Sequence, residues 1–404
     1  MAFAVWQRTV ATSLLSLLMV AGLALWTPPL GEAASSLPQP KFLFVTQSSA
    51  GKVLGYLINP TTGALRPTGQ GAVSAHLAPV KAAVNKAGTY LYVANLNSHD
   101  LSVYAINRTN GYLKQLAGSP FKVTGSASNV AVHPSGNYVF VTTNTSQGGN
   151  NSVTAFKVES TGALVQVPGS PFATQGDPLA VAVDPSGKYL YTADFGSDYI
   201  NAFTINSVDG GLTPIAGEPY RPPLQRNCPC ADAAPADIII DSTGSHLYAA
   251  GAFAGSIAGY RIDKTTGALA PISGSPFVDR MPTGESMDPA FNPYSIAIDP
   301  QGKFLYGYDS GDEDISIFSV NAMTGALKLA KKTANTYGGV SSGDIIRIDP
   351  SGQFVYALGT TATQTSGAVL GFHINRTSGN LTSVAGSPAK ANVDSFSDGV
   401  AVSR

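Results

Sequence analysis

Short apolar runs separated by turn residues follow one another along most of the chain. Residues 179–220 show the pattern most clearly, with apolar runs at 180–183, 189–193, 199–205 and 212–216. Each run is rich in Val, Ile, Tyr or Thr and is followed by Gly, Pro, Asp or Ser, as expected for strands joined by tight turns. Four such strands in succession predict an up-and-down antiparallel sheet, which cannot bury both of its faces alone.

The same unit repeats along the chain. Its second strand begins with an aromatic residue or histidine in seven places, at Phe42, Tyr90, Tyr138, Tyr189, His246, Phe304 and Phe354. A glycine marks the turn between its third and fourth strands, also seven times, at Gly63, Gly111, Gly162, Gly211, Gly267, Gly325 and Gly379. Self-similarity of this kind is the signature of a repeat architecture.

The first unit lacks its first strand. The turn that closes a first strand, typified by Asp-Pro-Ser-Gly, occurs six times, and the tail 399–403 has the first-strand pattern with no second strand after it. We therefore predict an all-β fold, a seven-bladed β-propeller of four-stranded antiparallel blades over residues 41–404. The C-terminal strand 399–403 joins the first blade and closes the ring.

Composition agrees with this prediction. The 404 residues include 43 Gly and 27 Pro, and only 12% are charged, which suits many short strands and turns. The formal net charge of −1 does not favour a broad basic surface, so no nucleic-acid partner is expected. The unbroken repeat indicates one closed domain, and we expect a monomer.

The N-terminus lies outside the repeat. Arg8 precedes an apolar run at 10–26, and small residues at 31 and 33 suit a cleavage site. Residues 1–33 are therefore predicted to be a signal peptide and 34–40 a short linker, which places the mature protein in the periplasm or outside the cell. An uncleaved anchor is the alternative, because the apolar run approaches the ~20 residues that span a bilayer. No other membrane association is predicted.

Aligning the innermost strands on their closing turns shows which residues face the channel. Two residues before the turn, six blades carry Ala or Ile and one carries Arg347. An arginine there must reach water or an acid, because an unpaired buried charge is costly. The candidate residues four or five positions before the turn, at the channel mouth, are Lys81, Asn129, Asp237, Tyr294, Asp344 and Asp398.

These side chains allow two interpretations. In the first, Arg347, Asp237 and Asp344 are catalytic, and the other four bind the ligand. A cation (Arg347 or Lys81) would polarise a carbonyl group while a carboxylate activates water. In the second, an ion-pair network that satisfies itself plugs the channel.

The sequence predicts neither a metal nor a cofactor. The acidic loop 309–314 lacks the ligand spacing of a calcium loop, and no phosphate loop, nucleophile elbow or zinc motif occurs. Cys228 and Cys230 lie in a polar insertion, where they form either a strained local disulfide or two free thiols.

The blade motifs resemble those of the propeller lactonase family. The sequences HPSGNYVFVTTN, DPSGKYLYTAD and DPSGQFVYALG are each followed by a TGAL-like turn and often by GSPF. The resemblance covers nearly all of residues 41–404. The family is typified by bacterial 6-phosphogluconolactonase and fungal carboxymuconate cyclase, so it implies a propeller that hydrolyses or forms a lactone.

Members of this family place an Arg-His pair just before one innermost strand. The corresponding segments here, 176–179, 234–237 and 291–294, do not contain it, so no catalytic residue is carried over from the family. The motif Tyr-Val-Ala-Asn at 92–95 is also similar to surface propellers built on Tyr-Val-Thr-Asn repeats.

Two functions stay open. One is an exported lactonase-like enzyme that acts on a small-molecule lactone at the channel mouth. The other is a non-catalytic envelope or secreted propeller that binds a protein or carbohydrate partner. An enzyme predicts an open polar pocket with perturbed carboxylates, whereas a binding module predicts a plugged channel and a patch elsewhere.

Overall fold

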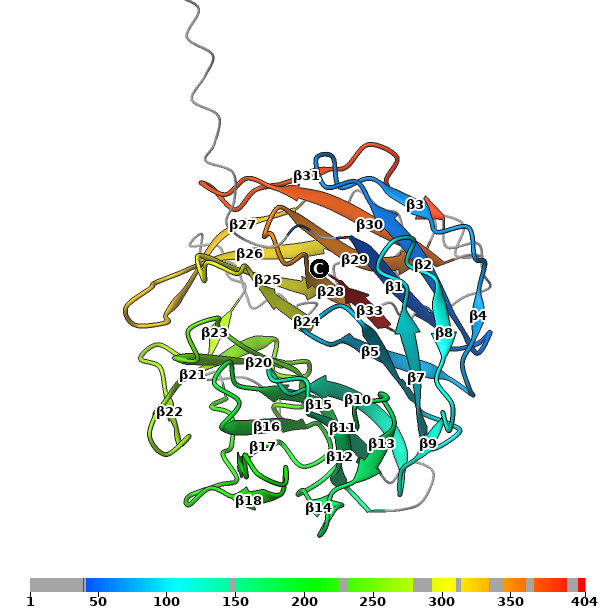
Figure 1. Ribbon diagram of the computed structural model, residues 1–404. Coiled ribbons are helices and arrows are strands. Elements are labelled where there is room, and N and C mark those ends of the chain that lie inside the picture. The colour runs from blue at the N-terminus through cyan, green and yellow to red at the C-terminus, as the bar shows by residue number, and fades with distance from the viewer. Residues whose placement is uncertain are drawn as a thin grey trace, which may run out of the picture. The chain divides into compact units, whose positions relative to one another are not determined.

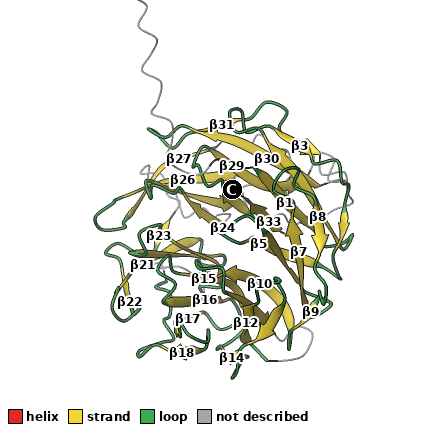
Figure 2. Ribbon diagram, viewed as in Figure 1, coloured by secondary structure: helices red, strands yellow, loops and turns green. Residues whose placement is uncertain are grey.

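The computed structural model describes residues 39, 41–144, 150–224, 232–278, 293–309, 314–333, 345–360, 367–390 and 399–403. Within these ranges all regular elements are strands (Figure 1, Figure 2), and no helix long and apolar enough to cross a membrane occurs. Several predicted features lie outside the described residues: the signal peptide 1–33, Cys228, Cys230, Asp344 and Asp398.

The strands form seven antiparallel sheets around a central axis (Figure 1), which confirms the predicted propeller. The innermost strands of blades 1 to 7 are β33 (Gly399–Val402), β5 (Pro79–Val84), β10 (Ser126–Val132), β15 (Pro178–Val183), β19 (Pro235–Ile240), β24 (Pro293–Ile298) and β28 (Ile346–Ile348). The second strands are β1 (Phe42–Gln47), β6 (Tyr90–Asn95), β11 (Tyr138–Asn144), β16 (Tyr189–Asp194), β20 (His246–Gly251), β25 (Phe304–Asp309) and β29 (Phe354–Thr360).

The third and fourth strands complete each blade outward. The third strands are β2 (Lys52–Ile58), β7 (Asp100–Ile106), β12 (Ser152–Val158), β17 (Tyr199–Ile205), β21 (Ser256–Ile262), β26 (Asp314–Val320) and β30 (Gly367–Ile374). The fourth strands are β3 (Leu65–Pro67), β8 (Leu113–Gln115), β13 (Leu164–Gln166), β18 (Leu212–Pro214), β22 (Leu269–Pro271), β27 (Leu327–Lys332) and β31 (Leu381–Ser383).

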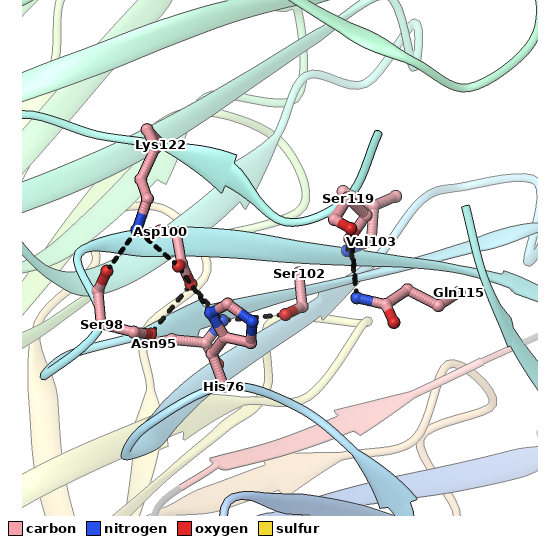
Figure 3. Close-up of polar contacts among 9 residues, drawn as sticks. All are labelled: His76, Asn95, Ser98, Asp100, Ser102, Val103, Gln115, Ser119 and Lys122. Atoms are coloured by element: carbon pink, nitrogen blue, oxygen red, sulfur yellow. Dashed lines mark hydrogen bonds and ion pairs between the residues drawn. The ribbon is translucent and has the colours of Figure 1, made fainter. Parts of the chain in front are cut away.

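In five blades a short additional strand also pairs with the third strand. These strands are β4 (Val73–Ser74), β9 (Phe121–Lys122), β14 (Phe172–Ala173), β23 (Phe277–Val278) and β32 (Ala389–Lys390). In blade 2, where the outer edge is interrupted, the hydroxyl of Ser119 accepts the backbone N–H of Val103 at 2.8 Å (Figure 3). The serine of the recurring Gly-Ser-Pro motif thus replaces a missing strand partner.

The C-terminal strand closes the ring. In Figure 1 the red β33 lies beside the blue β1, and the two strands pair antiparallel from Leu43 opposite Val402 to Thr46 opposite Gly399. Ser403 extends the pairing, since its backbone N–H donates to the carbonyl oxygen of Phe42 at 2.9 Å. The predicted closure through strand 399–403 is confirmed.

The hydrophobic cores lie between blades. Seven clusters of buried side chains occur among the described residues, and each combines residues of two neighbouring blades. In the cluster that joins blade 7 to blade 1, Tyr356 and Leu358 pack with Leu43 and Val45. A blade contributes to the core on each side of it, so a blade alone would expose both of its faces.

A glycine of each third-to-fourth turn lies against the aromatic residue or histidine that begins the second strand of the preceding blade. At Gly379 the backbone φ is +74°, and a Cβ atom would lie 2.5 Å from the ring of Phe304. In blade 4 the glycine that meets the ring is Gly210 (φ +80°, against Tyr138), the neighbour of Gly211 in the same predicted turn. The sequence offers two adjacent glycines there, and only the backbone shows which of them needs the left-handed conformation.

Tyrosine hydroxyls fasten the same boundaries. The hydroxyl of Tyr306 in blade 6 donates to the carbonyl oxygen of Gly379 in blade 7 at 2.9 Å. Tyr356 in blade 7 donates to the carbonyl oxygen of Gly63 in blade 1 at 2.8 Å, across the point of ring closure. The turn glycine therefore both accommodates a ring and accepts a hydrogen bond from the neighbouring blade.

We predict that Gly379→Ala destabilises the protein more than Gly136→Ala. Both glycines have a positive φ, but nothing lies within 4 Å of a Cβ atom placed at Gly136. The backbone change should cost about 1–2 kcal/mol at either position, and overlap with Phe304 should add about 1–3 kcal/mol at Gly379. Urea unfolding of both variants measures the difference, and equal losses would contradict the proposed contact.

Candidate functional site

A cavity of about 420 Å³ lies between the innermost strands, and all seven of them contribute residues to its wall. This volume is in the range of small-molecule sites. Most of the wall consists of Ala, Val and Ile, and the predicted residues Lys81, Asn129, Asp237 and Arg347 also lie on it. An ion pair forms in the channel, as described below, yet room for a small ligand is left beside it.

A register shift positions the residues at the channel mouth. In five innermost strands the pairing shifts just before the residue four positions from the closing turn, which is Lys81, Asn129, Ala180, Asp237 or Ser295. Such a bulge changes the direction of the side chain that follows it. The bulge therefore sets the direction of three predicted site residues, Lys81, Asn129 and Asp237. Regular strand alternation alone would not give this direction.

The carboxylate of Asp237 is held by two neighbouring strands. Its Oδ2 accepts the hydroxyl of Ser295 at 2.8 Å and the backbone N–H of Ile296 at 3.1 Å, and its Oδ1 accepts the N–H of Ile238 at 2.9 Å. The Nη1 atom of Arg347 lies 3.6 Å from Oδ2. These contacts compensate for the burial of the carboxylate and connect blades 5, 6 and 7.

The guanidinium of Arg347 is anchored through one nitrogen. Besides the ion pair with Asp237, Nη1 donates to Ser295 Oγ at 3.3 Å and to the carbonyl oxygen of Ile346 at 2.8 Å. Within the described part of the chain, neither Nη2 nor Nε makes a hydrogen bond or ion pair. The side chain is 31% exposed. Arg347 therefore lies on the cavity wall as an anchored cation, two of whose nitrogens have no contact among the described residues.

Sequence reasoning missed the role of Ser295. This serine occupies the same strand position as Asp237, but a small hydroxyl carries no charge that needs a partner, so it gave no signal. In the structure its Oγ lies between the two charged groups and also accepts the backbone N–H of Ile346 at 3.2 Å. Ser295 fixes the geometry of the Asp237–Arg347 pair.

Asn129 links two innermost strands at the cavity wall. Its Nδ2 donates to the carbonyl oxygen of Leu179 in blade 4 at 3.0 Å, and its Oδ1 accepts the N–H of Val130 at 2.8 Å. Both ends of the amide thus have a structural partner. A contact between Asn129 and a ligand stays a prediction.

Tyr294 is not among the residues that line the cavity. Its ring belongs to an aromatic cluster on the rim, with centroids 6.5 Å apart between Tyr294 and Phe195 and 5.2 Å apart between Phe195 and Phe253. The three rings come from consecutive blades, and Phe253 is 56% exposed. Tyr294 therefore packs at the rim and does not line the cavity, so it is not placed to contact a ligand inside it.

Strained backbone gathers on the same rim. The five non-glycine residues with positive φ in the described ranges all lie in loops that lead into innermost or third strands: Ala78, His99, Asp177, Asp198 and Ala234. Such strain costs of order 1–3 kcal/mol at each residue and occurs preferentially at functional sites. Its confinement to one face favours this rim as the functional one.

A second polar cluster fixes the rim in blade 2 (Figure 3). The fully buried Asp100 contacts His76 Nδ1 at 2.8 Å and Lys122 Nζ at 3.2 Å, and it accepts hydrogen bonds from Asn95 and Ser98, each at 2.9 Å. None of these residues lines the cavity. The cluster ties the loop that leads into β5, the strand that carries Lys81.

The buried Asp194 plays a similar part in blade 4. It accepts hydrogen bonds from Thr192 at 2.7 Å, from Asn201 at 2.6 Å, and from the backbone N–H groups of Gln175 and Gly176. Burial raises the pKa of Asp194 to about 6, and these hydrogen bonds limit the rise. The carboxylate holds the loop that leads into β15.

A family model described as "Lactonase, 7-bladed beta-propeller" matches residues 38–224 and 283–394. The chain belongs to this family. The resemblance inferred from the blade motifs is confirmed.

Proteins similar to this lactonase propeller are named as lactonases. A 6-phosphogluconolactonase of Serratia proteamaculans is 22% identical over 343 residues, covering 74% of this chain and 95% of the relative. One of Formosa agariphila is 23% identical over 332 residues, covering 79% of this chain and 75% of the relative. Among solved structures, the periplasmic gluconolactonase of Pseudomonas aeruginosa has a TM-score of 0.71 at 18% identity, covering 91% of this chain and 99% of that one. At that identity the likeness shows the shared fold.

We predict that Asp194→Asn changes the pH dependence of stability. The folded-state pKa of Asp194 lies above its ordinary value of 3.8, so the folded protein binds this proton more tightly than the unfolded chain does. The resulting stabilisation is complete below about pH 4 and is lost as the pH rises through about 6. Relative to the parent, the variant should therefore gain about 2 kcal/mol between pH 4 and pH 7.

Chemical unfolding of the parent and of Asp194→Asn at both pH values measures this difference. The comparison cancels the titration of the other carboxylates, which is common to both proteins. A difference in unfolding free energy that stays constant with pH would contradict the raised pKa.

Proposed function

We propose that this protein is an exported lactonase-like hydrolase that opens a small-molecule lactone in the axial cavity. The observation that carries the proposal is the anchored guanidinium of Arg347 on the wall of a cavity of about 420 Å³. Membership of the lactonase propeller family supports it. The Arg-His pair expected from the resemblance is missing, so the chemistry has to come from other residues.

Arg347 serves as the electrophile in this proposal. The lactone carbonyl oxygen receives hydrogen bonds from Nη2 and Nε, which contact no partner among the described residues, and these bonds strengthen as charge develops on that oxygen. Water forms a bond to the carbonyl carbon, the bond between this carbon and the ring oxygen breaks, and the ring oxygen takes up a proton. The anchoring of Nη1 by Asp237, Ser295 and Ile346 holds the cation in place before the substrate arrives.

Asp237 is the proposed general base. An ionised carboxylate offers about four acceptor positions, and three hydrogen bonds engage this one. One position is left for the attacking water. Asp344, outside the described residues, is the second candidate base. Asp398, Lys81 and Asn129 remain proposed ligand contacts in the cavity, and Tyr294 remains a proposed contact only at the rim.

The names of the relatives suggest the substrate class. Relatives carry the name 6-phosphogluconolactonase, and a protein of the same fold is a periplasmic gluconolactonase. We therefore propose a sugar-derived lactone as the first substrate to test. The periplasmic location of that neighbour also supports export of this chain.

The second candidate function is non-catalytic binding of a carbohydrate or protein partner at the rim. The aromatic cluster of Phe195, Phe253 and Tyr294 favours it, because an exposed flat ring suits the apolar face of a sugar. This function would leave the protein without turnover while the rim still binds its partner.

We predict that Arg347→Gln lowers kcat/KM for lactone hydrolysis by about 100- to 1000-fold, the effect of removing one oxyanion donor. Asp237→Asn should lower it by about 100- to 10,000-fold through loss of the base. Purified mature protein is assayed by pH-stat on glucono-1,5-lactone, its 6-phosphate and γ-butyrolactone.

Arg66→Gln is the matched control, since Arg66 is exposed on β3 and away from the cavity wall. It should retain the activity of the parent. Turnover that survives Arg347→Gln in a folded protein would refute the assigned electrophile. Absence of turnover in the parent on every lactone would favour the second candidate function.

We further predict that the protein is exported and that its mature N-terminus lies near Ala34. The apolar run at 10–26 followed by small residues is the basis of this expectation. Cell fractionation and N-terminal sequencing of the full-length product measure both points. A cytoplasmic protein that keeps residues 1–33 would contradict export, and a membrane-bound one would favour the uncleaved anchor.

A further inference from the structure

The cavity contains a cation whose hydrogen-bonding capacity is only partly used. A guanidinium has five N–H donors, and every contact that Arg347 makes in the described part of the chain involves Nη1. Two such donors in the guanidinium plane match the two oxygens of a carboxylate. The unused side of Arg347 therefore suits a planar anion better than a neutral carbonyl.

Two carboxylates of the described residues, Asp237 and Asp349, line the cavity, and both have other partners. Asp237 is engaged by Ser295, Ile296 and Ile238, as described above. Asp349, in the closing turn of β28, accepts the backbone N–H groups of Ser351 and Phe354 at 2.7 and 2.6 Å. Arg347 contacts neither of these two carboxylates through Nη2 or Nε.

Ring opening changes the charge of the ligand. A neutral lactone and water give a hydroxy acid, which at neutral pH has lost its carboxyl proton to the solvent and is a carboxylate. The Coulomb attraction between Arg347 and this carboxylate does not exist for the neutral lactone, and it is strengthened where a site is partly removed from water. The same residue thus distinguishes product from substrate by charge.

We propose that the cavity retains the hydroxy-carboxylate product on Arg347, so that the ring-opened acid inhibits the enzyme. The carboxylate would form the paired contact with Nη2 and Nε, while the ion pair of Nη1 with Asp237 stays intact. Inhibition by the product rests on the proposed lactonase function, whereas binding of the acid to Arg347 does not require turnover. The two ideas can therefore fail separately.

The test measures equilibrium binding to the purified mature protein by calorimetry or ligand-observed NMR. The probes are two matched pairs: gluconate with glucitol, and 4-hydroxybutyrate with 1,4-butanediol. Within each pair the two molecules differ mainly in the carboxylate. At least one acid should bind measurably, and its neutral partner should bind at least 10-fold more weakly. Affinity for the acid should fall as salt rises from 20 to 300 mM.

Variants assign the contact to Arg347. Arg347→Gln should weaken binding of the acid by about 10- to 100-fold, the range expected for a charge-assisted pair. Arg347→Lys, which keeps the charge without the planar fork, should bind with intermediate affinity. Arg66→Gln should bind like the parent. Thermal unfolding of each variant shows whether the fold persists, and if Arg347→Gln is unfolded the Lys variant and the salt series decide.

Equal affinity for an acid and its neutral partner would overturn the proposal, as would unchanged binding of the acid in a folded Arg347→Gln variant. No binding of either acid at 50 mM would also overturn it. If the acids bind at Arg347 and no lactone is hydrolysed, the carboxylate site stands and the proposed lactonase function falls. If lactones are hydrolysed and their acids do not inhibit, the lactonase function stands and the proposed product inhibition falls.

Discussion

The contact between neighbouring blades is the constraint on which the structure depends. At each boundary a turn glycine lies against a ring that begins the second strand of the preceding blade, as Gly379 does against Phe304. All seven hydrophobic clusters of the described residues lie between blades. A single blade has no core of its own, so the sheets become stable only as a closed ring.

Ring closure creates the cavity and also limits what it can contain. The innermost strands crowd around the axis, and most wall positions are therefore Ala, Val or Ile. A charged residue can be placed there only with partners from adjacent blades. Arg347 meets this condition through Asp237 of blade 5 and Ser295 of blade 6. Such an arrangement holds a cation rigidly next to an open volume, which is what electrostatic catalysis and anion binding both require.

Membership of the lactonase propeller family does not by itself identify the catalytic residues of this protein. The family model describes blade motifs, and those motifs build turns and interblade contacts that any propeller of this type needs. The Arg-His pair expected from the resemblance is absent at the corresponding segments, while Asp237, Ser295 and Arg347 form a polar group across three innermost strands. The proposed activity therefore rests on the geometry around Arg347 more than on kinship.

The sequence alone determined the number of blades, their strand order and the closure by strand 399–403, because short-range turn chemistry and strand alternation repeat visibly. It also singled out Arg347 and Asp237, since charges are rare among the alanines of an inner strand. Only the tertiary structure decided that Ser295 joins them, that Tyr294 packs with Phe195 instead of lining the cavity, and that Gly210 rather than Gly211 makes the turn contact. These outcomes depend on bulges and on approaches between blades roughly fifty residues apart in sequence, where three-dimensional packing, and not the local pattern, sets the direction of each side chain.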